Sequence, residues 1–374
     1  TGHAFVRGNR EVQPEGQAPI PSDMITIPKL LGKAGYVNGM FGKWGLGAPK
    51  SSGDPMNQGW DEFYGYNCQR QAHNFYPKHL WHNSEKVILD GKTYSHDLIQ
   101  EQALKFIRNN AKKTFFAYLP ITIPHAAMQC PEEDVAPFRK KFPQFENKIG
   151  KYSQGTEVRN PVAAFAGMMT RMDRGVGQVL DLLNELNIAN NTLVLFTSDN
   201  GPHYEGGHQP GFFNSNGPLK GHKRDLYEGG IRVPLIAYWP SKIKPGSISD
   251  HICAHWDFLP TFCDLAKISI PSHTDGISYM PTLTGRKQKA HSYLYWEFHS
   301  YGNAQAIRMG DWKGIRLKVK NNPTAPIQLY NLKQDIGETK NIATNHPDII
   351  KRITQLFKSA HTPSDRFPLF AEKE

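Results

Sequence analysis

Short apolar runs alternate with longer amphipathic segments through the first two thirds of the chain. Four apolar runs, each too short to form a helix of its own, predict buried strands: Val37–Phe41, Phe115–Leu119, Leu193–Phe196 and Leu235–Tyr238. Helical spacing of apolar residues predicts covering helices at 26–34, 97–111, 161–187 and 257–266. This alternation is typical of an α/β protein with a doubly wound, mixed or parallel sheet flanked by helices. The strand Leu193–Phe196 is expected to be one of the parallel strands.

The pattern changes near residue 290. Three short runs at 293–298, 304–309 and 312–317 predict strands, and a final amphipathic segment at 347–360 predicts a helix. The expected result is a small antiparallel sheet with one helix packed on it. We therefore divide the chain into a larger domain, residues 1–289, and a C-terminal subdomain, residues 290–374.

Three stretches show no clear periodicity and are predicted as loops. Residues 1–22 hold glycine, proline and glutamine, and 131–156 is polar and basic, as expected for an insertion. Residues 59–83 are rich in aromatic residues and histidine. Such a loop can stack on sugar rings while Arg70 and His73 bind hydroxyl or sulfate oxygens, although a hydrophobic cover over a sheet edge explains the aromatic residues equally well.

Asp199 and Asn200 directly follow the run Leu193–Phe196, and Gly201 comes next. Ligands of open α/β sheets lie beyond the carboxyl ends of the strands, so this pair can offer two hard oxygen ligands to one cation. The alternative is an ordinary strand-to-loop turn, because Asp, Asn and Gly are common turn formers. On the helix 161–187, the charged residues Arg171 and Arg174 are interpreted as a solvated face.

Composition limits the possible partners but does not choose among them. The 374 residues carry a formal net charge of +10, which favours anionic partners such as sulfated glycans or nucleic acid. The basic residues are dispersed, without the long run that is typical of a nucleic-acid-binding tail, and no nucleic-acid partner is expected. The sequence holds no apolar run long enough for a membrane span. Its four cysteines lack zinc-finger spacing.

Several separate motifs together resemble the sulfatase family, relatives of alkaline phosphatase. The stretch at 198–203 reads S-D-N-G-P-H, and 216–234 reads N-G-P-L-K-G-H-K-R-D-L-Y-E-G-G-I-R-V-P. Residues 35–47 read G-Y-V-N-G-M-F-G-K-W-G-L-G, a Pro-His pair stands at 124–125, and 329–343 reads L-Y-N-L-K-Q-D-I-G-E-T-K-N-I-A. The motifs follow the family's order and cover nearly the whole chain.

The resemblance implies roles for particular residues. Lys43 and Lys223 would bind the sulfate, with Lys220 as the lesser candidate for the second position, and His125 would be a sulfate contact or the acid that protonates the leaving oxygen. Asp199 and Asn200 would bind calcium. His203, Arg70, His73 and His299 are candidate substrate contacts.

Two family features are absent from these residues. No C-x-P-S-R or S-x-P-S-R motif occurs, so the formylglycine nucleophile and two further Asp ligands are expected upstream of residue 1. Gly45 stands where the family commonly has a histidine that holds the nucleophile. The chain taken alone is therefore expected to be inactive.

The resemblance implies a sulfuric ester hydrolase that acts on sulfated carbohydrate, by analogy a galactose or N-acetylgalactosamine sulfate, with calcium and formylglycine as cofactors. Two alternatives stay open: a phosphomonoesterase or phosphodiesterase of the same superfamily, and a non-catalytic fragment that binds sulfated glycans. The family's usual setting implies an exported protein, whether periplasmic, extracellular or lysosomal.

Overall fold

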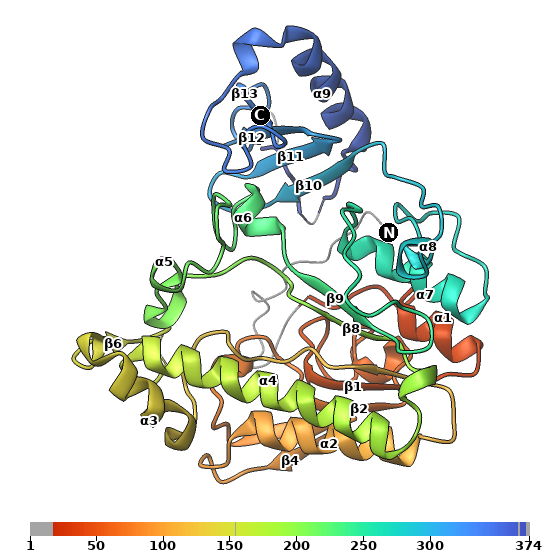
Figure 1. Ribbon diagram of the computed structural model, residues 1–374, viewed down its shortest axis with the longest axis vertical. Helices are drawn as coiled ribbons and strands as arrows, with labels where there is room; N and C mark the ends of the chain where they lie inside the picture. The colour runs from red at the N-terminus through yellow and green to blue at the C-terminus, as the bar shows by residue number, and fades with distance from the viewer. Residues whose placement is uncertain (1–17, 154, 366, 372–374) are drawn as a thin grey trace.

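A larger α/β part and a smaller C-terminal sheet make up the protein (Figure 1). The computed structural model describes residues 18–153, 155–365 and 367–371. The predicted loop at 1–22 lies mostly outside these residues. Among the described helices, none combines the length and apolar character that crossing a bilayer requires.

The main sheet has five strands in the order β4-β3-β2-β1-β5. The central strands β1 (Val37–Lys43), β2 (Glu62–Tyr66) and β5 (Phe115–Tyr118) are parallel to one another. Strands β3 (His79–His82) and β4 (Glu85–Ile88) add an antiparallel edge. Because β1 and β2 are parallel, the loops that follow them leave from the same edge of the sheet.

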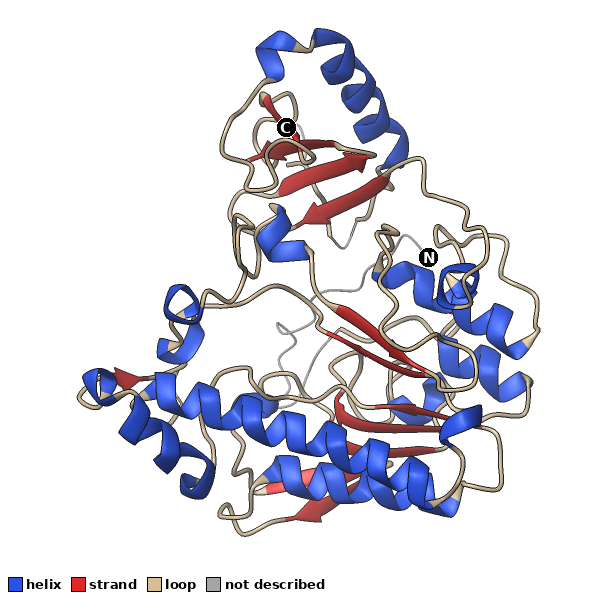
Figure 2. Cartoon of the chain, in the orientation of Figure 1, coloured by secondary structure: helices blue, strands red, loops and turns tan. Residues whose placement is uncertain are grey.

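Helices cover both faces of this sheet, as expected for the doubly wound fold (Figure 2). On one face, α2 (Ser95–Asn109) and α4 (Pro161–Glu185) pack against a core that includes Phe41 and Phe106. On the other face, Phe116 of β5 contacts Phe262 of α7 (Phe258–Ala266), and α1 (Ile27–Lys33) lies beside α7.

Strands β8 (Val194–Thr197) and β9 (Leu235–Tyr238) form a separate two-stranded sheet. They pair in antiparallel orientation, so the prediction of a parallel strand at 193–196 is wrong. An apolar run identifies a strand but carries no information on the direction of its neighbour, which explains the error.

Two predicted loops contain regular structure. Residues 132–141 form the helix α3 (Glu132–Lys141), with three acidic residues in its first turn and three basic residues in its last. This charge order complements the helix dipole and is the signal that the loop prediction missed. The aromatic stretch 59–83 contains β2, the 3-10 turn η2 (Gln71–His73) and β3.

The remaining short elements connect these parts of the fold. They are η1 (Pro55–Gln58), η3 (Pro143–Phe145), β6 (Ile149–Gly150), β7 (Val158–Arg159), η4 (Ala189–Asn191), η5 (Glu205–Gly207), α5 (Pro210–Phe213), α6 (Glu228–Ile231), η6 (His255–Asp257), α8 (Met280–Leu283) and η7 (Ala343–Asn345).

The C-terminal sheet is antiparallel in the order β10-β11-β12-β13. Its strands are β10 (Leu294–Phe298), β11 (Ala304–Met309), β12 (Trp312–Leu317) and β13 (Ile327–Asn331), and α9 (Pro347–Ala360) packs on it. The predicted antiparallel sheet with one helix is confirmed, with β13 as an additional strand. The division at residue 289 stays a prediction.

A buried ion pair connects the C-terminal sheet to the larger part of the chain. Lys313 of β12 lies 2.6 Å from a carboxylate oxygen of Glu228 in α6. The backbone N–H of Glu228 donates to Glu338 Oε2 at 2.7 Å. Glu228, Lys313 and Glu338 are each no more than 1% exposed, so the two parts share a desolvated charged contact.

Candidate functional site

Lys43 is the last residue of β1, and a close backbone approach fixes its position. The preceding Gly42 has φ +144°, and a Cβ on it would lie 2.2 Å from the carbonyl oxygen of Pro120. The Lys43 N–H donates to that same carbonyl at 3.0 Å. The lysine thus leaves the carboxyl end of the sheet beside the loop that follows β5, where ligands of such sheets bind.

Lys223 reaches the same region from a segment far away in the sequence. Its N–H donates to the carbonyl of Pro202 at 2.8 Å, in the loop after β8. Gly201 donates to Gly230 at 3.0 Å, and a Cβ on Gly201 would lie 1.8 Å from the Gly229 carbonyl oxygen. These glycines permit the close contact between the two segments.

The two lysines and Asp199 interact electrostatically. Burial lowers the pKa of Lys43, the Asp199 carboxylate opposes this shift, and the positive charge of Lys223 adds to it. Two ammonium groups beside a partly buried position have the charge that suits an oxyanion with more than one charged oxygen.

A histidine stack lies next to the lysines. The rings of His73 and His125 are 5.2 Å apart and nearly parallel, and Tyr152 packs edge-on against both. Burial and the charges of Lys43 and Lys223 lower the pKa of His73 to about 4. Burial, Lys223 and Lys43 likewise lower the pKa of His125 to about 2. Both rings are therefore neutral at pH 7 while no anion offsets the lysines.

The hydrogen bond of His125 determines which of its ring nitrogens can exchange a proton. Its Nδ1 lies 2.6 Å from the Ala126 carbonyl oxygen, which can only accept, so Nδ1 carries the proton. Nε2 is then the nitrogen that can exchange a proton with a ligand.

His203 belongs to the same group of rings. It lies 5.7 Å from His125, centroid to centroid, and its Nε2 is 3.2 Å from the Pro124 carbonyl. Its Nδ1 lies 3.0 Å from Glu205 Oε2, and Arg224 pairs with the other oxygen of that carboxylate. Burial alone would raise the pKa of Glu205, but His203, Lys223 and Arg224 together lower it well below its usual range.

Asp199 and Asn200 follow β8, as predicted. Carboxylate and amide oxygens are ligands that calcium prefers, but calcium takes six to eight of them. Across residues 18–153, 155–365 and 367–371, no cluster of three or more His, Cys, Asp or Glu side chains could hold a metal ion. The pair fits calcium in chemistry but is too small to bind it alone, so further ligands would come from elsewhere.

Three candidate residues lie in other surroundings. Arg70 is exposed on the loop before η2. His299 contacts Glu297 on the C-terminal sheet, with 3.1 Å between its Nε2 and the carboxylate. Lys220, the lesser candidate for the second sulfate lysine, donates to the Glu338 carbonyl at 3.1 Å. The roles of all these residues stay predictions.

Several residues of this region were not predicted from the sequence. Glu205, Arg224 and Tyr152 join the histidine group through contacts between distant segments. His255 lies near Asp199, whose charge opposes the lowering of the His255 pKa by burial. Arg224 also has φ +83°, a conformation that is uncommon outside glycine.

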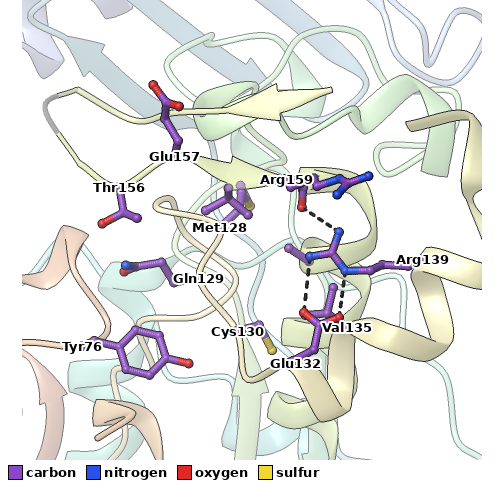
Figure 3. A pocket seen from close by; sticks show the side chains of 12 residues that line it. Tyr76, Met128, Gln129, Cys130, Glu132, Val135, Arg139, Thr156, Glu157 and Arg159 are labelled. Carbon is purple, nitrogen blue, oxygen red and sulfur yellow. Dashed lines mark hydrogen bonds and ion pairs between the residues drawn. The ribbon is translucent and has the colours of Figure 1, made fainter. Parts of the chain in front are cut away.

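A separate hollow of about 300 Å³ opens between α3 and the β6–β7 hairpin (Figure 3). None of the nine predicted site residues lines it. Its Arg139 is held by Glu132 and by the Arg159 carbonyl, as the dashed lines in Figure 3 show. The Arg139 charge in the hollow is therefore already paired with a carboxylate.

Comparisons with known proteins give the family of the chain. The Sulfatase family model matches residues 4–268, and that for the N-sulphoglucosamine sulphohydrolase C-terminal region matches 221–362. The human N-acetylgalactosamine-6-sulfatase is 28% identical, with 95% of this chain and 66% of the relative covered. The N-acetylgalactosamine-6-O-sulfatase of Bacteroides thetaiotaomicron is 27% identical over 77% of this chain and 55% of its own.

A solved structure is also similar. The crystal structure of Ps i-CgsB in complex with k-i-k-neocarrahexaose superposes with a TM-score of 0.76 at 28% identity, covering 92% of this chain and 75% of that one. The chain spans just under two thirds of the human relative. Because the Sulfatase model matches well over half of its residues, the chain belongs to the sulfatase family.

Proposed function

We propose that this chain is the major part of a sulfatase that hydrolyses sulfate esters of carbohydrates. The observation that supports the proposal best is the approach of Lys43 and Lys223 to each other and to His125. These residues come from three distant segments. Two cations and a neutral histidine beside a carboxyl-terminal strand edge suit a sulfate ester, because its oxygens need positive charge and its leaving alkoxide needs a proton.

In this proposal the lysines bind the sulfate oxygens, and binding changes the state of His125. Burial is the main cause of the low His125 pKa and Lys223 and Lys43 add to it; an anionic sulfate between the lysines would offset their two contributions and so favour a proton at Nε2. That proton is transferred to the sugar oxygen as the sulfur–oxygen bond breaks. The contact with Glu205 holds the His203 ring beside His125, and Arg224 keeps the Glu205 carboxylate charged.

The remaining parts of the proposal follow from family membership. Calcium at Asp199 and Asn200 would neutralise further sulfate charge, and a formylglycine upstream of residue 1 would supply the nucleophile. We propose galactose or N-acetylgalactosamine sulfate as the substrate, supported by the names of the relatives and by the aromatic residues near His73. We also propose that the protein is exported.

Binding is the first test, because residues 1–374 alone are expected to release no sulfate. Titration calorimetry with N-acetylgalactosamine 6-sulfate should detect binding that Lys43→Ala or Lys223→Ala weakens about tenfold or more, as expected for loss of a charge-assisted contact. Lys33→Ala, on the exposed end of α1, is the matched control. Equal binding by all four proteins would contradict the lysine site.

A second measurement separates the alternatives. Release of sulfate and of phosphate should be measured in the presence of calcium, from a sulfate ester and a phosphate ester of the same sugar. Both this chain and a longer form that carries the nucleophile motif should be assayed. Sulfate release by the longer form alone supports a sulfatase whose catalytic group lies outside these residues. Phosphate release without sulfate release would favour a phosphomonoesterase or phosphodiesterase, and binding without any release would favour a glycan-binding protein.

A further inference from the structure

Three phenylalanine rings meet at the surface near the start of α4. Phe212 of α5 is 44% exposed. Its ring centroid lies 4.9 Å from that of Phe145 and 5.2 Å from that of Phe142, with edge-to-face geometry in both pairs. An exposed cluster of this kind leaves apolar ring surface in water, which a ligand can cover.

Two lysines flank these rings. Lys141 Nζ lies 5.8 Å from the centroid of Phe142, and Lys148 Nζ lies 5.1 Å from that of Phe145. Both lysines are exposed. Glu132 and Glu146, which lie close to them in the sequence, pair with Arg139. The two ammonium groups thus stand beside the rings with their charge facing solvent.

A continuous row of rings connects this cluster to the sulfate site. His203 lies 5.7 Å from His125, His208 lies 5.2 Å from His203, and Phe213 lies 5.8 Å from His208. Phe213 in turn lies 5.0 Å from Phe212. In Figure 1, α5 and β6 lie together at the beginning of α4, away from the C-terminal sheet.

We propose that Phe212, Phe142 and Phe145, with Lys141 and Lys148, form a distal subsite for a further sulfated sugar of the same glycan chain. This inference rests on the proposed function. The apolar face of a sugar ring covers Phe212, and a lysine binds its sulfate. The alternation of rings and unpaired cations fits a sulfated glycan better than an apolar protein surface, which would place no charge there. The protein then binds sulfated oligosaccharides more tightly than single sulfated sugars.

The test compares two ligands on the 374-residue chain. A sulfated neocarrahexaose and the sulfated galactose monosaccharide that is one of its units are titrated by calorimetry against the unaltered chain, Phe212→Ala and Lys148→Ala. The hexasaccharide should bind at least about tenfold more tightly than the monosaccharide, and each substitution should remove most of that difference while leaving monosaccharide affinity unchanged. Ile88→Ala and Lys86→Ala on β4 serve as controls, since they also remove an exposed apolar side chain and a lysine above an aromatic ring.

Three results would overturn the subsite. One is equal affinity of the unaltered chain for the two ligands. Another is an equal loss of both affinities in Phe212→Ala. In either case, weaker binding of the ligands by Lys43→Ala would leave the proposed function intact. The third is an oligomer in sedimentation velocity that Phe212→Ala converts to monomer, which would assign the rings to contact between copies. Absence of binding to either sulfated sugar would instead refute the proposed function, and the subsite with it. Circular dichroism of each variant verifies folding.

Discussion

Gly42 is a position at the site that leaves no room for a side chain. Its φ of +144° disfavours any L side chain, and a Cβ would lie only 2.2 Å from the Pro120 carbonyl oxygen. We expect Gly42→Ala to destabilise the protein by about 2 kcal/mol or more, and to move Lys43 with the strand end. Urea unfolding measures the free energy change, and binding of N-acetylgalactosamine 6-sulfate reports the position of Lys43.

Gly177→Ala is the matched control. Gly177 lies within α4, has an ordinary helical conformation, and has open space where its Cβ would lie. The same substitution there should stabilise the protein by about 0.5–1 kcal/mol, because alanine has the higher helix propensity. If the two variants unfold alike, the close approach at Gly42 does not matter for stability.

Part of the site could be predicted from the sequence. Motifs that follow a predicted strand or lie at family spacing contain Lys43, His125, Asp199 and Lys223. In the structure, Lys43 interacts electrostatically with Asp199 and Lys223. Glu205 and its partners could not be predicted, because their contacts depend on how the loop after β8 meets distant segments. Local sequence carries no signal of such contacts.

At the scale of elements, Arg171 joins three helices. From α4 it donates to both carboxylate oxygens of Asp97 in α2, at 2.8 and 2.6 Å, and it pairs with Asp134 in α3. Its side chain is only 12% exposed, so its interpretation as a solvated residue is wrong. Helical periodicity placed it on the polar face of α4, but α2 and α3 cover that face.

Loss of Arg171 should therefore be costly. Arg171→Met keeps the length of the side chain but leaves the buried Asp134 with Arg174 alone, and we expect a loss of about 3 kcal/mol in the free energy of unfolding. Arg108→Met, which breaks a pair with the exposed Glu185, should change stability little. Urea denaturation of both variants tests this, and equal effects would mean that the contacts of Arg171 with Asp97 and Asp134 do not stabilise the protein.

Elements with strong periodicity were predicted well, and those set by tertiary contact were not. The long helix at 161–187 and the final helix at 347–360 match α4 and α9 closely because their apolar spacing is complete. The helix α3 could not be predicted from periodicity because its apolar positions are few and Pro137, a residue that disfavours helix, lies within it. The antiparallel pairing of β8 depends on β9, a strand about forty residues away, so no local pattern reveals it.

At the scale of the whole molecule, Glu338 makes the stability of the protein depend on pH. Burial raises the pKa of Glu338 to about 7 from an ordinary 4.5, despite the opposing charge of Lys313. The folded protein thus binds this proton more tightly than the unfolded chain. Its contribution to stability is full below pH 4.5 and is lost as the pH rises towards 7, with a slope of at most about 1.4 kcal/mol per pH unit.

Glu338→Gln should flatten that part of the pH profile, since glutamine does not titrate. Thermal or urea unfolding from pH 4.5 to 7.5 measures the slope, and the difference between the variant and the unaltered protein isolates this group from other titrations. Glu85→Gln, on exposed β4, should leave the slope unchanged. A slope that survives in Glu338→Gln would mean that another group causes it.

The separation of β8 and β9 from the main sheet also bears on the behaviour of the protein at high concentration. Within the described chain, β5 is an edge strand of the main sheet, and β8 and β9 are both edge strands of the two-stranded sheet, so each presents one side without a neighbouring strand. Tyr118 of β5 is 46% exposed and Ile236 of β9 is 59% exposed, so apolar side chains accompany these open edges. Such edges are templates for strand addition between molecules. Residues 1–374 on their own should therefore aggregate by intermolecular β-pairing as concentration rises, unless another strand caps the edges.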